Sequence, residues 1–381
     1  MNKSEESSWD NKNKAHNFYA DIKKIGVVGS TGKVGRIVCD ELKDKYNIIK
    51  GSSNKDRVKD GYVYIDFNNE KSVDQFCRKC DIVVNCAGPT YIIQDKIAKF
   101  AHKNKAIYID AFGGNVLEDK LKRLNEEGVY IISAGCLPGL SGVLVKELSK
   151  EDADNDTTIS IYTGGLESGG KNACADIILS SVLGYGMPNQ IIKNSNIYKS
   201  NNQYNNFVDI DGFKESVYIQ EFLTAEMIKE VELYGIKNLI SYQAVPNKKI
   251  SEIISNGCIN YINNKNIWDV VECADNEINK MISGEKHWFS MLAKRERKKF
   301  YTVTEKKILV KAENSTIITA YMMAAIVQKA AEDIINPGVY WGFEILKLDE
   351  VIEYFKGKNG IIQLTVENNM RENIDLEEGM I

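Results

Sequence analysis

The sequence predicts an α/β fold, with a doubly wound parallel sheet followed by a second, α+β domain that contains a mixed sheet. Strand and helix patterns alternate over the first 150 residues, which is typical of parallel sheets covered on both faces. A glycine-rich turn joins the first strand to the first helix, and the pattern changes after the charged run EDADNDT at 151–157. The length of 381 residues exceeds what one small core needs, so we expect two domains.

The elements of the first domain follow from apolar runs and apolar spacing. Runs such as DIVVNC and VYIISA are continuously apolar, as buried parallel strands are. Six strands are predicted, at 24–28, 46–50, 62–67, 81–86, 106–110 and 129–134. Segments with apolar residues at helical spacing predict helices at 34–45, 71–79, 91–104, 117–127 and 140–150.

The rest of the chain divides into further segments. Residues 1–20 lack an apolar signal region and are expected to be a disordered lead-in, so that residues 21–150 form the first domain. Residues 151–315 are assigned to a domain for substrate binding and dimerisation, with a strand at 158–163, a helix at 173–185 and short alternating runs across 198–310. The long apolar helix at 316–335 opens a C-terminal segment, 316–381, that is expected to return to the first domain.

Composition argues against several classes of protein. The net charge of −4 and the pI of about 5.7 offer no basic face for nucleic acid, and the basic run KRERKK at 294–299 is interpreted as a solvated helix face. No apolar run reaches the roughly 18 residues of a membrane span. A zinc site needs four ligands, whereas this chain offers three dispersed His and a single CxxC, at 77–80. We therefore expect a cytoplasmic protein with reduced thiols, no metal, and neither a membrane nor a nucleic-acid partner.

The glycine turn is the main functional signal. It carries glycines at 29, 32 and 35, with Thr31 where the dinucleotide fingerprint usually has its middle glycine. Between a strand and a helix, such a turn lets the backbone approach a pyrophosphate at the helix N-terminus, as in a Rossmann fold. The alternative is a tight turn without a ligand. The predicted cofactor contacts here are Gly29, Ser30, Thr31, Gly32, Lys33, Val34 and Gly35.

The end of the second strand favours NADP over NAD. An NAD site usually offers an acidic residue there for the ribose 2′-hydroxyl, whereas this chain offers Ser52, Ser53 and Lys55, with Arg57 nearby. Hydroxyls and cations suit a 2′-phosphate. The alternative is that the two cations are only solvated loop charges.

Residues that follow the other strands are expected to line the same crevice, because ligands of open α/β sheets bind beyond the carboxyl ends of the strands. Small residues would let the ribose and nicotinamide pass close to the backbone. These predicted contacts are Asp66, Phe67, Cys86, Ala87, Gly88, Pro89, Asp110 and Gly135.

Four segments together resemble a known family. GSTGKVG, NCAGPT, AIYIDAFGG and AGCLPGLSG, in this order, are similar to the saccharopine dehydrogenase (glutamate-forming) family of NAD(P)-dependent oxidoreductases. The resemblance implies an enzyme that acts on CH–NH or C=N groups, by reducing an imine or running the reverse reaction. The serine–tryptophan–serine run that the family usually carries after GGL (164–166) is replaced by ILSSVLGYGMPN, which argues against saccharopine itself as the substrate.

Imine reduction needs a proton for the nitrogen and a site that excludes water. Three residues are candidates for catalytic roles: Tyr185 and His287 as acids, and Lys171 as a partner for a substrate carboxylate. Each has a plainer alternative, namely a core tyrosine, a surface aromatic pair beside Trp288, and a solvated lysine.

The predicted function is therefore NADP-dependent reduction of a C=N bond in an amino-acid-derived or biosynthetic intermediate, by an imine reductase that forms a homodimer. One alternative is an enoyl (C=C) reductase of the same superfamily. Another is a redox sensor that binds NADP without catalysis. The substrate and the direction of reaction stay open, because pocket shape depends on side chains from distant segments.

Overall fold

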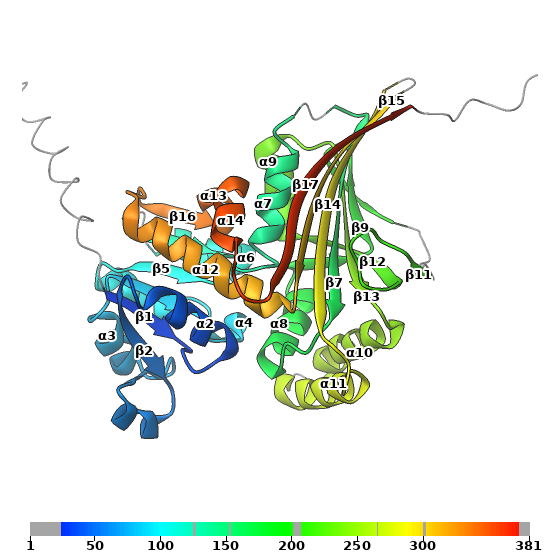
Figure 1. Ribbon diagram of the computed structural model, residues 1–381. Coiled ribbons are helices and arrows are strands. Elements are labelled where there is room, and N and C mark those ends of the chain that lie inside the picture. The colour runs from blue at the N-terminus through cyan, green and yellow to red at the C-terminus, as the bar shows by residue number, and fades with distance from the viewer. Residues whose placement is uncertain are drawn as a thin grey trace, which may run out of the picture.

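The computed structural model describes residues 24–124, 127–151, 154–200, 207–264, 266–299 and 302–372, arranged around two sheets (Figure 1). The predicted lead-in at 1–20 lies outside these residues. In Figure 1 the first sheet and its helices lie on the left, and the second, strongly curved sheet lies on the right.

The first sheet has seven strands in the order β16-β6-β5-β4-β1-β2-β3, and every neighbouring pair is parallel. This doubly wound arrangement confirms the predicted Rossmann-type fold class. The six expected strands are joined by one from near the C-terminus. The bounds are β1 (Lys24–Val28), β2 (Asn47–Ser52), β3 (Val63–Tyr64), β4 (Ile82–Asn85), β5 (Ile107–Asp110), β6 (Val129–Ile132) and β16 (Gly338–Trp341).

The helices between these strands cover the faces of the sheet. They are α2 (Lys33–Leu42), η1 (Lys55–Asp60), α3 (Glu70–Cys77), α4 (Thr90–Ile93), α5 (Lys96–Lys103), α6 (Gly114–Lys122) and α7 (Leu140–Leu148). The single helix predicted over 91–104 is wrong. Gln94 adopts φ 52° and ψ −133°, which ends the helical hydrogen bonds of α4 before α5 begins.

The second sheet has ten strands, and its main path runs β10-β9-β13-β7-β14-β15-β17. The sheet is mixed, as predicted, because β7 pairs in parallel with β13 and antiparallel with β14. The bounds are β7 (Thr157–Leu166), β8 (Gly186–Pro188), β9 (Gln190–Lys193), β10 (Asn196–Lys199), β11 (Phe207–Val208), β12 (Val217–Thr224), β13 (Asn238–Val245), β14 (Trp288–Lys299), β15 (Thr302–Ala312) and β17 (Ile361–Glu372).

The alternating runs across 198–310 contribute strands to this mixed sheet as predicted, and three helices that the runs did not indicate also lie among the described residues of this region. They are α9 (Ala225–Tyr234), α10 (Lys248–Asn264) and α11 (Ile267–Met281), and α8 (Lys171–Val182) precedes them. Thr224 accepts a hydrogen bond from the backbone N–H of Met227, and Asn266 accepts one from that of Trp268. These N-caps mark the starts of α9 and α11.

The predicted return of the whole segment 316–381 to the first domain is wrong for its last strand. Helix α12 (Ser315–Glu332), β16, α13 (Gly342–Ile345) and α14 (Leu348–Phe355) come before it. Strand β16 joins the first sheet, but β17 pairs along its length with β15 in the second. The backbone hydrogen bonds between β17 and β15 hold this last strand in the second sheet. The chain therefore crosses between the two sheets again after β16.

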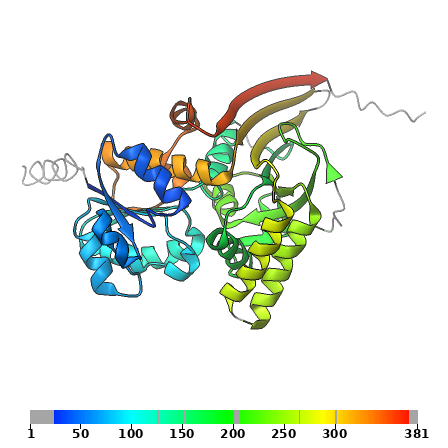
Figure 2. The same ribbon diagram turned by 60° about the horizontal axis from the view of Figure 1, so that its bottom comes forward.

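Helix α12 links the two halves of the molecule. Figure 2 shows it, in orange, running beside α2 and ending at the second sheet. Its side chains are apolar on several sides, and ten of its residues are buried, which is the pattern of a helix enclosed by protein.

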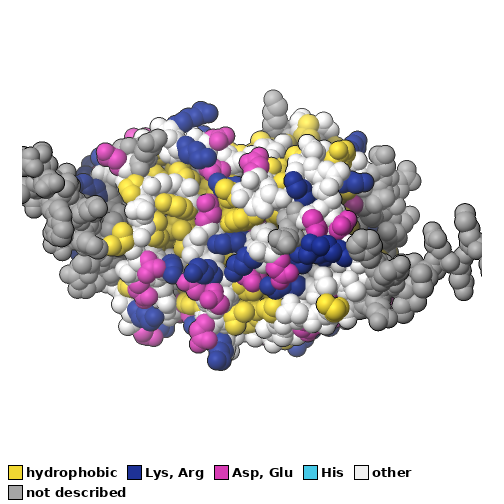
Figure 3. Space-filling view, turned by 90° about the horizontal axis from the view of Figure 1, so that it is seen from above, with side chains coloured by type: hydrophobic (Ala, Val, Ile, Leu, Met, Phe, Trp, Pro, Cys, Tyr) yellow, Lys and Arg dark blue, Asp and Glu magenta, His cyan; other side chains and the backbone are white. Residues whose placement is uncertain are grey.

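The basic run at 294–299 lies in strand β14 and not on a helix face as predicted. Lys294 pairs with Glu296, Arg295 with Glu151 and Arg297 with Asp154. On the face in Figure 3, Lys and Arg side chains lie among Asp and Glu side chains. The acidic partners therefore neutralise much of the charge of this run.

The described residues contain neither a membrane-spanning helix nor a cluster of metal ligands. None of the described helices has both the length and the apolarity to cross a membrane. The same residues contain no group of three or more His, Cys, Asp or Glu placed to hold a metal ion.

Candidate cofactor and substrate crevice

The glycine turn between β1 and α2 is shaped by close backbone contacts. Gly29 has φ +73°, and a Cβ there would lie 2.8 Å from the backbone nitrogen of Ala87. A Cβ on Gly35 would lie 2.4 Å from the carbonyl oxygen of Gly29. Only glycine lets the turn, the first turn of α2 and the loop after β4 approach this closely.

The N-terminus of α2 is open to an anion. Its N-cap is Gly32, and no side chain caps the helix, so the first N–H groups have no intrahelical or side-chain partner. Gly32 and Lys33 are exposed, and Thr31 is half-buried. Val34 is also half-buried and packs on the core. A pyrophosphate fits such a helix start.

Two serines expected to touch the cofactor instead stabilise the turn. The buried hydroxyl of Ser30 donates to the carbonyl oxygen of Gly51 at 2.7 Å, which joins the glycine turn to β2. The buried hydroxyl of Ser52 accepts from the backbone N–H of Asn54 at 3.2 Å. Ser53, Lys55 and Arg57 are exposed beyond them, so these groups are left for a 2′-phosphate.

The end of the third strand offers a second boundary of the crevice. The carboxylate of Asp66 accepts from the Tyr64 hydroxyl at 3.3 Å and from the backbone N–H of Asn68 at 2.9 Å. The half-buried ring of Phe67 has the Lys96 ammonium 5.4 Å from its centroid. Asp66 is thus held in place, and Phe67 offers an aromatic surface.

Asp110 organises the ends of β4 and β5. Its carboxylate accepts from the Asn85 amide at 2.9 Å, the Tyr108 hydroxyl at 2.6 Å, the Thr90 hydroxyl at 3.3 Å and the backbone N–H of Phe112 at 3.0 Å. Burial raises its pKa, and these hydrogen bonds oppose the rise. With its acceptor sites used, Asp110 holds the loops together, and its carboxylate is not free for a cofactor.

The other residues predicted to contact the cofactor lie in the loops after β4 and β6. The Cys86 thiol lies 3.9 Å from the Met323 sulfur on α12, so its side chain leaves the crevice. Ala87, Gly88 and buried Pro89 form the loop after β4. A Cβ on Gly135 would lie 2.9 Å from the carbonyl oxygen of Ala111, so the backbone segments after β5 and β6 are also close to each other.

Asp176 is the functional candidate that sequence reasoning missed. It lies on α8, and its carboxylate accepts from the backbone N–H of Thr90 at 3.0 Å. Its second oxygen lies 3.1 Å from where a Cβ on Gly88 would be. Burial, and then the negative charge of Asp110, raises the pKa of Asp176 to about 7. A carboxyl group that can hold a proton at neutral pH therefore faces the loop after β4. An acid in the otherwise apolar run ACADIILSSV was the available signal.

Aromatic side chains lie next to this carboxyl group. The rings of Tyr91 and Phe112 are 5.6 Å apart, and those of Phe112 and Tyr185 are 5.1 Å apart. The Tyr91 hydroxyl is buried and has no hydrogen-bond partner among the described residues. Burial, followed by the charge of Asp176, raises the pKa of Tyr91. The Tyr185 hydroxyl is likewise buried without a partner among these residues, so the row holds two hydroxyls whose hydrogen-bonding capacity is unused.

The three predicted catalytic residues are not brought together. Tyr185 is buried at 2% exposure, with its ring against Gly114 and Phe112. His287 is exposed just before β14. Lys171 is exposed and forms an ion pair with Glu272 of α11. Of the three, only Tyr185 reaches the aromatic row.

The glycine turn also contacts the second sheet. The Lys33 ammonium donates to the carbonyl oxygen of Ser168 at 3.4 Å. The neighbouring Glu167 accepts from the backbone N–H of Ser315, at the start of α12, at 2.6 Å. Burial raises the pKa of Glu167, and the hydrogen bonds from Ser315 oppose the rise. Both halves of the molecule therefore meet at this edge of the crevice.

Comparison with protein families agrees with this geometry. Residues 25–131 match the family described as the saccharopine dehydrogenase NADP binding domain. The predicted resemblance and the choice of NADP are both confirmed, and the uncapped helix start and close glycine turn fit that cofactor.

Solved structures and one curated relative extend the comparison. The apo saccharopine dehydrogenase (L-Glu forming) from Saccharomyces cerevisiae aligns over 91% of this chain and 100% of its own, with a TM-score of 0.61 and 13% identity. This likeness shows a shared fold. A DAP dehydrogenase from C. glutamicum covers 87% of this chain and 98% of its own, with a TM-score of 0.47 and 14% identity. A lipid droplet localized protein from Caenorhabditis elegans is 26% identical over 99 residues, which are 25% of this chain and 23% of the relative.

Proposed function

Because residues 25–131 belong to the saccharopine dehydrogenase NADP binding domain family, we propose that this protein reduces a C=N bond of an amino-acid-derived or biosynthetic intermediate. We place the substrate between the domain at 21–150 and the domain at 151–315. Bound NADPH would supply the hydride for such a reduction. The remaining requirements fall to the residues of the chain: to orient the cofactor, to hold a proton and to exclude water.

The cofactor would be held along the carboxyl ends of the strands. The exposed N–H groups at the start of α2 would bind the pyrophosphate. Ser53 and Lys55 are the exposed groups nearest the end of β2, and they suit a 2′-phosphate. The loop from Cys86 to Pro89 would carry the ribose and nicotinamide past the backbone.

The observation that carries the proposal is the protonatable carboxyl group of Asp176. A pKa of about 7 makes it a proton donor at neutral pH, which is the range in which a general acid works best. Its position against Gly88 and Thr90 puts that proton at the loop expected to carry the nicotinamide. The buried Tyr91 hydroxyl beside it can bind a polar atom of the substrate.

The test is NADPH oxidation with pairs of amines and 2-oxoacids or aldehydes that form imines in solution. We expect Asp176→Asn to lower kcat by about 100-fold or more, with the NADPH dissociation constant unchanged. Asparagine keeps an oxygen that can accept from the N–H of Thr90, so the loop contact survives. Glu272→Gln, which removes an exposed carboxylate of α11 that is paired with Lys171, is the matched control and should keep wild-type rates.

Two other outcomes favour the alternative functions. Oxidation of NADPH by conjugated enoyl substrates and not by imines would indicate a C=C reductase. Tight NADPH binding with no turnover of either class would favour a non-catalytic redox sensor. Activity on imines that is indifferent to Asp176→Asn would keep the reaction and reject the proposed acid.

A cytoplasmic homodimer is also part of the proposal. The composition supports the cytoplasmic location, and the second sheet supports the homodimer. Sedimentation velocity of the purified chain would measure the oligomeric state, and a monomer at micromolar concentration would contradict it.

A further inference from the structure

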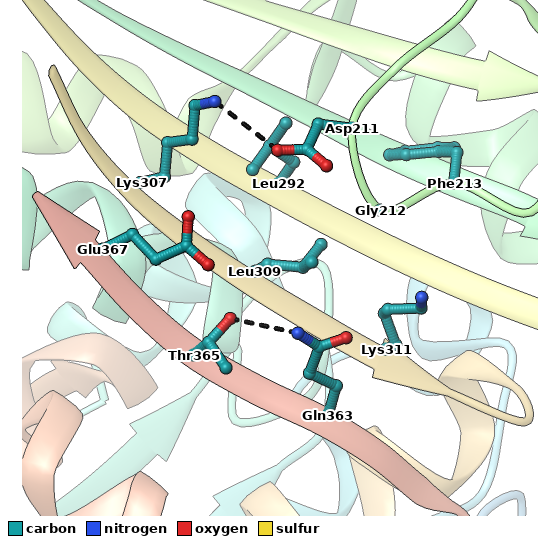
Figure 4. Close-up of a pocket in the computed structure, with 10 residues that line it drawn as sticks. All are labelled: Asp211, Gly212, Phe213, Leu292, Lys307, Leu309, Lys311, Gln363, Thr365 and Glu367. Carbon is teal, nitrogen blue, oxygen red and sulfur yellow. Dashed lines mark hydrogen bonds and ion pairs between the residues drawn. The ribbon is translucent and has the colours of Figure 1, made fainter. Parts of the chain in front are cut away.

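A second cavity lies on the second sheet, and none of its lining residues belongs to the crevice described above. It has a volume of about 310 Å³, which suits a small metabolite. Its floor comes from β14, β15 and β17, and its wall from the segment Asp211–Phe213 (Figure 4). We call it the sheet pocket.

The pairing of β15 with β17 orders the groups along the sheet pocket. Three cross-strand pairs face it: Lys311 with Gln363, Leu309 with Thr365, and Lys307 with Glu367. Leu292 of β14 lies opposite Leu309, so the middle of the floor is apolar. The two ends are polar and charged.

The charges at the two ends are not equivalent. The Lys307 ammonium is paired with Asp211 at 3.4 Å and with Glu305 at 3.2 Å, and Figure 4 shows it turned toward Asp211. Among the described residues, Lys311 and Glu367 have no ion-pair partner. One end of the pocket thus keeps an unneutralised cation, and the other an unneutralised anion.

The wall of the pocket is fixed before any ligand binds. The Ser290 hydroxyl donates to the carbonyl oxygen of Gly212 at 3.1 Å. The Trp288 indole N–H donates to the Glu215 carboxylate at 3.2 Å, and its ring meets that of Phe213 edge-on at 5.8 Å. A pre-formed wall lowers the entropy cost of binding.

We propose that the sheet pocket binds an elongated zwitterion, with a carboxylate at Lys311 and Gln363 and a protonated amine at Glu367. The two ends are four residues apart along β17, or about 13 Å at the usual rise of a strand. A ligand that bridges the two ends therefore carries its charges on a chain of several methylenes. The apolar floor at Leu292 and Leu309 suits that chain. This inference does not depend on the proposed oxidoreductase activity.

The test is calorimetric titration of the full chain with 6-aminohexanoate and 8-aminooctanoate. Octanoate and octylamine, which each lack one charge, are the control ligands. We expect at least one of the ω-amino acids to bind, and each control ligand to bind about tenfold more weakly, because one charge-assisted contact is lost. Lys311→Gln and Glu367→Gln should each weaken binding of the ω-amino acid by about the same factor.

Matched variants separate the pocket from general charge effects. Lys356→Gln and Glu353→Gln change exposed charges at the C-terminal end of α14 and should leave the affinity unchanged. The proposal would be overturned if neither ω-amino acid binds at about 10 mM. It would also be overturned if all four variants bind the ω-amino acid with equal affinity. A shift of the oligomeric state by Lys311→Gln without any ligand binding would also overturn it, because the face would then be a contact between copies.

Discussion

Gly35→Ala tests whether the glycine turn is built by steric necessity. The added methyl group would lie 2.4 Å from the carbonyl oxygen of Gly29 and 2.8 Å from the Cα of Ser30. Both are backbone atoms that cannot rotate away, so the start of α2 must move back by roughly 0.6 Å to reach even a 3.0 Å contact. That displacement moves the N–H groups that would bind the pyrophosphate.

The magnitude follows from the cost of overpacking. An inserted methyl in a tightly packed site costs about 1–3 kcal/mol, which corresponds to roughly a 5- to 150-fold change in an equilibrium constant. We expect this cost to be divided between a lower free energy of unfolding and a weaker affinity for NADPH. An even division would lower the affinity by roughly 2- to 12-fold.

The assay is a fluorescence titration with NADPH, accompanied by urea unfolding. Gly257→Ala is the matched control in the second domain, because its methyl group would meet side chains and no backbone: the flexible end of Ile178 at 2.9 Å and Val270 at 3.5 Å. The control should bind NADPH as the wild type does. Wild-type affinity and stability in Gly35→Ala would refute the steric argument and leave the turn without a demonstrated requirement for glycine.

Three further predictions concern individual side chains. The folded-state pKa of Asp176 is raised from 3.8 to about 7, so the folded chain binds more protons than the unfolded chain between about pH 4 and pH 7, and this group lowers stability as the pH rises through that window. Urea unfolding at pH 5 and pH 8 should show Asp176→Asn removing up to roughly 2–3 kcal/mol of that fall, and an unchanged pH dependence would contradict it. Asp110→Asn should destabilise the chain by about 2–4 kcal/mol, since it turns an acceptor of four hydrogen bonds into a mixed donor, and a thermal midpoint equal to that of the wild type would argue against the network. Lys171→Met should leave kcat within about twofold, because its ion pair with Glu272 is exposed, whereas a large loss in a steady-state assay would restore Lys171 as a substrate contact.

Most of the cofactor half could be predicted because its signals are local. The turn at Gly29, Gly32 and Gly35 lies within seven residues, between an apolar strand and an amphipathic helix. The alternation of strands and helices implies a parallel sheet, and a parallel sheet puts the ends of its strands at one edge. The direction of individual side chains was less accessible. The hydroxyl of Ser30 and the thiol of Cys86 turn away from the crevice to contacts with Gly51 and Met323.

The part of the candidate site around Asp176 could not be predicted, because its contacts join residues that are far apart in the chain. Asp176 meets Thr90 across 86 residues, and Lys171 meets Glu272 across 101 residues. No periodicity in the sequence reports which of these side chains will be paired and which will be buried. The choice of Tyr185, His287 and Lys171 rested on residue type, whereas burial and charge partners decide what each group can do.

The sequence by itself determined the Rossmann-type domain, the place of its phosphate-binding turn and the preference for NADP, because all three depend on the spacing of neighbouring residues. The tertiary structure alone decided that β17 closes the second sheet and that Asp176 faces the loop after β4. It also decided that Lys311 and Glu367, which have no ion-pair partner in the part of the chain that the structure describes, lie at opposite ends of one pocket. These features come from strand pairing and helix docking between distant segments, and a pKa or an unpaired charge exists only once those segments have met.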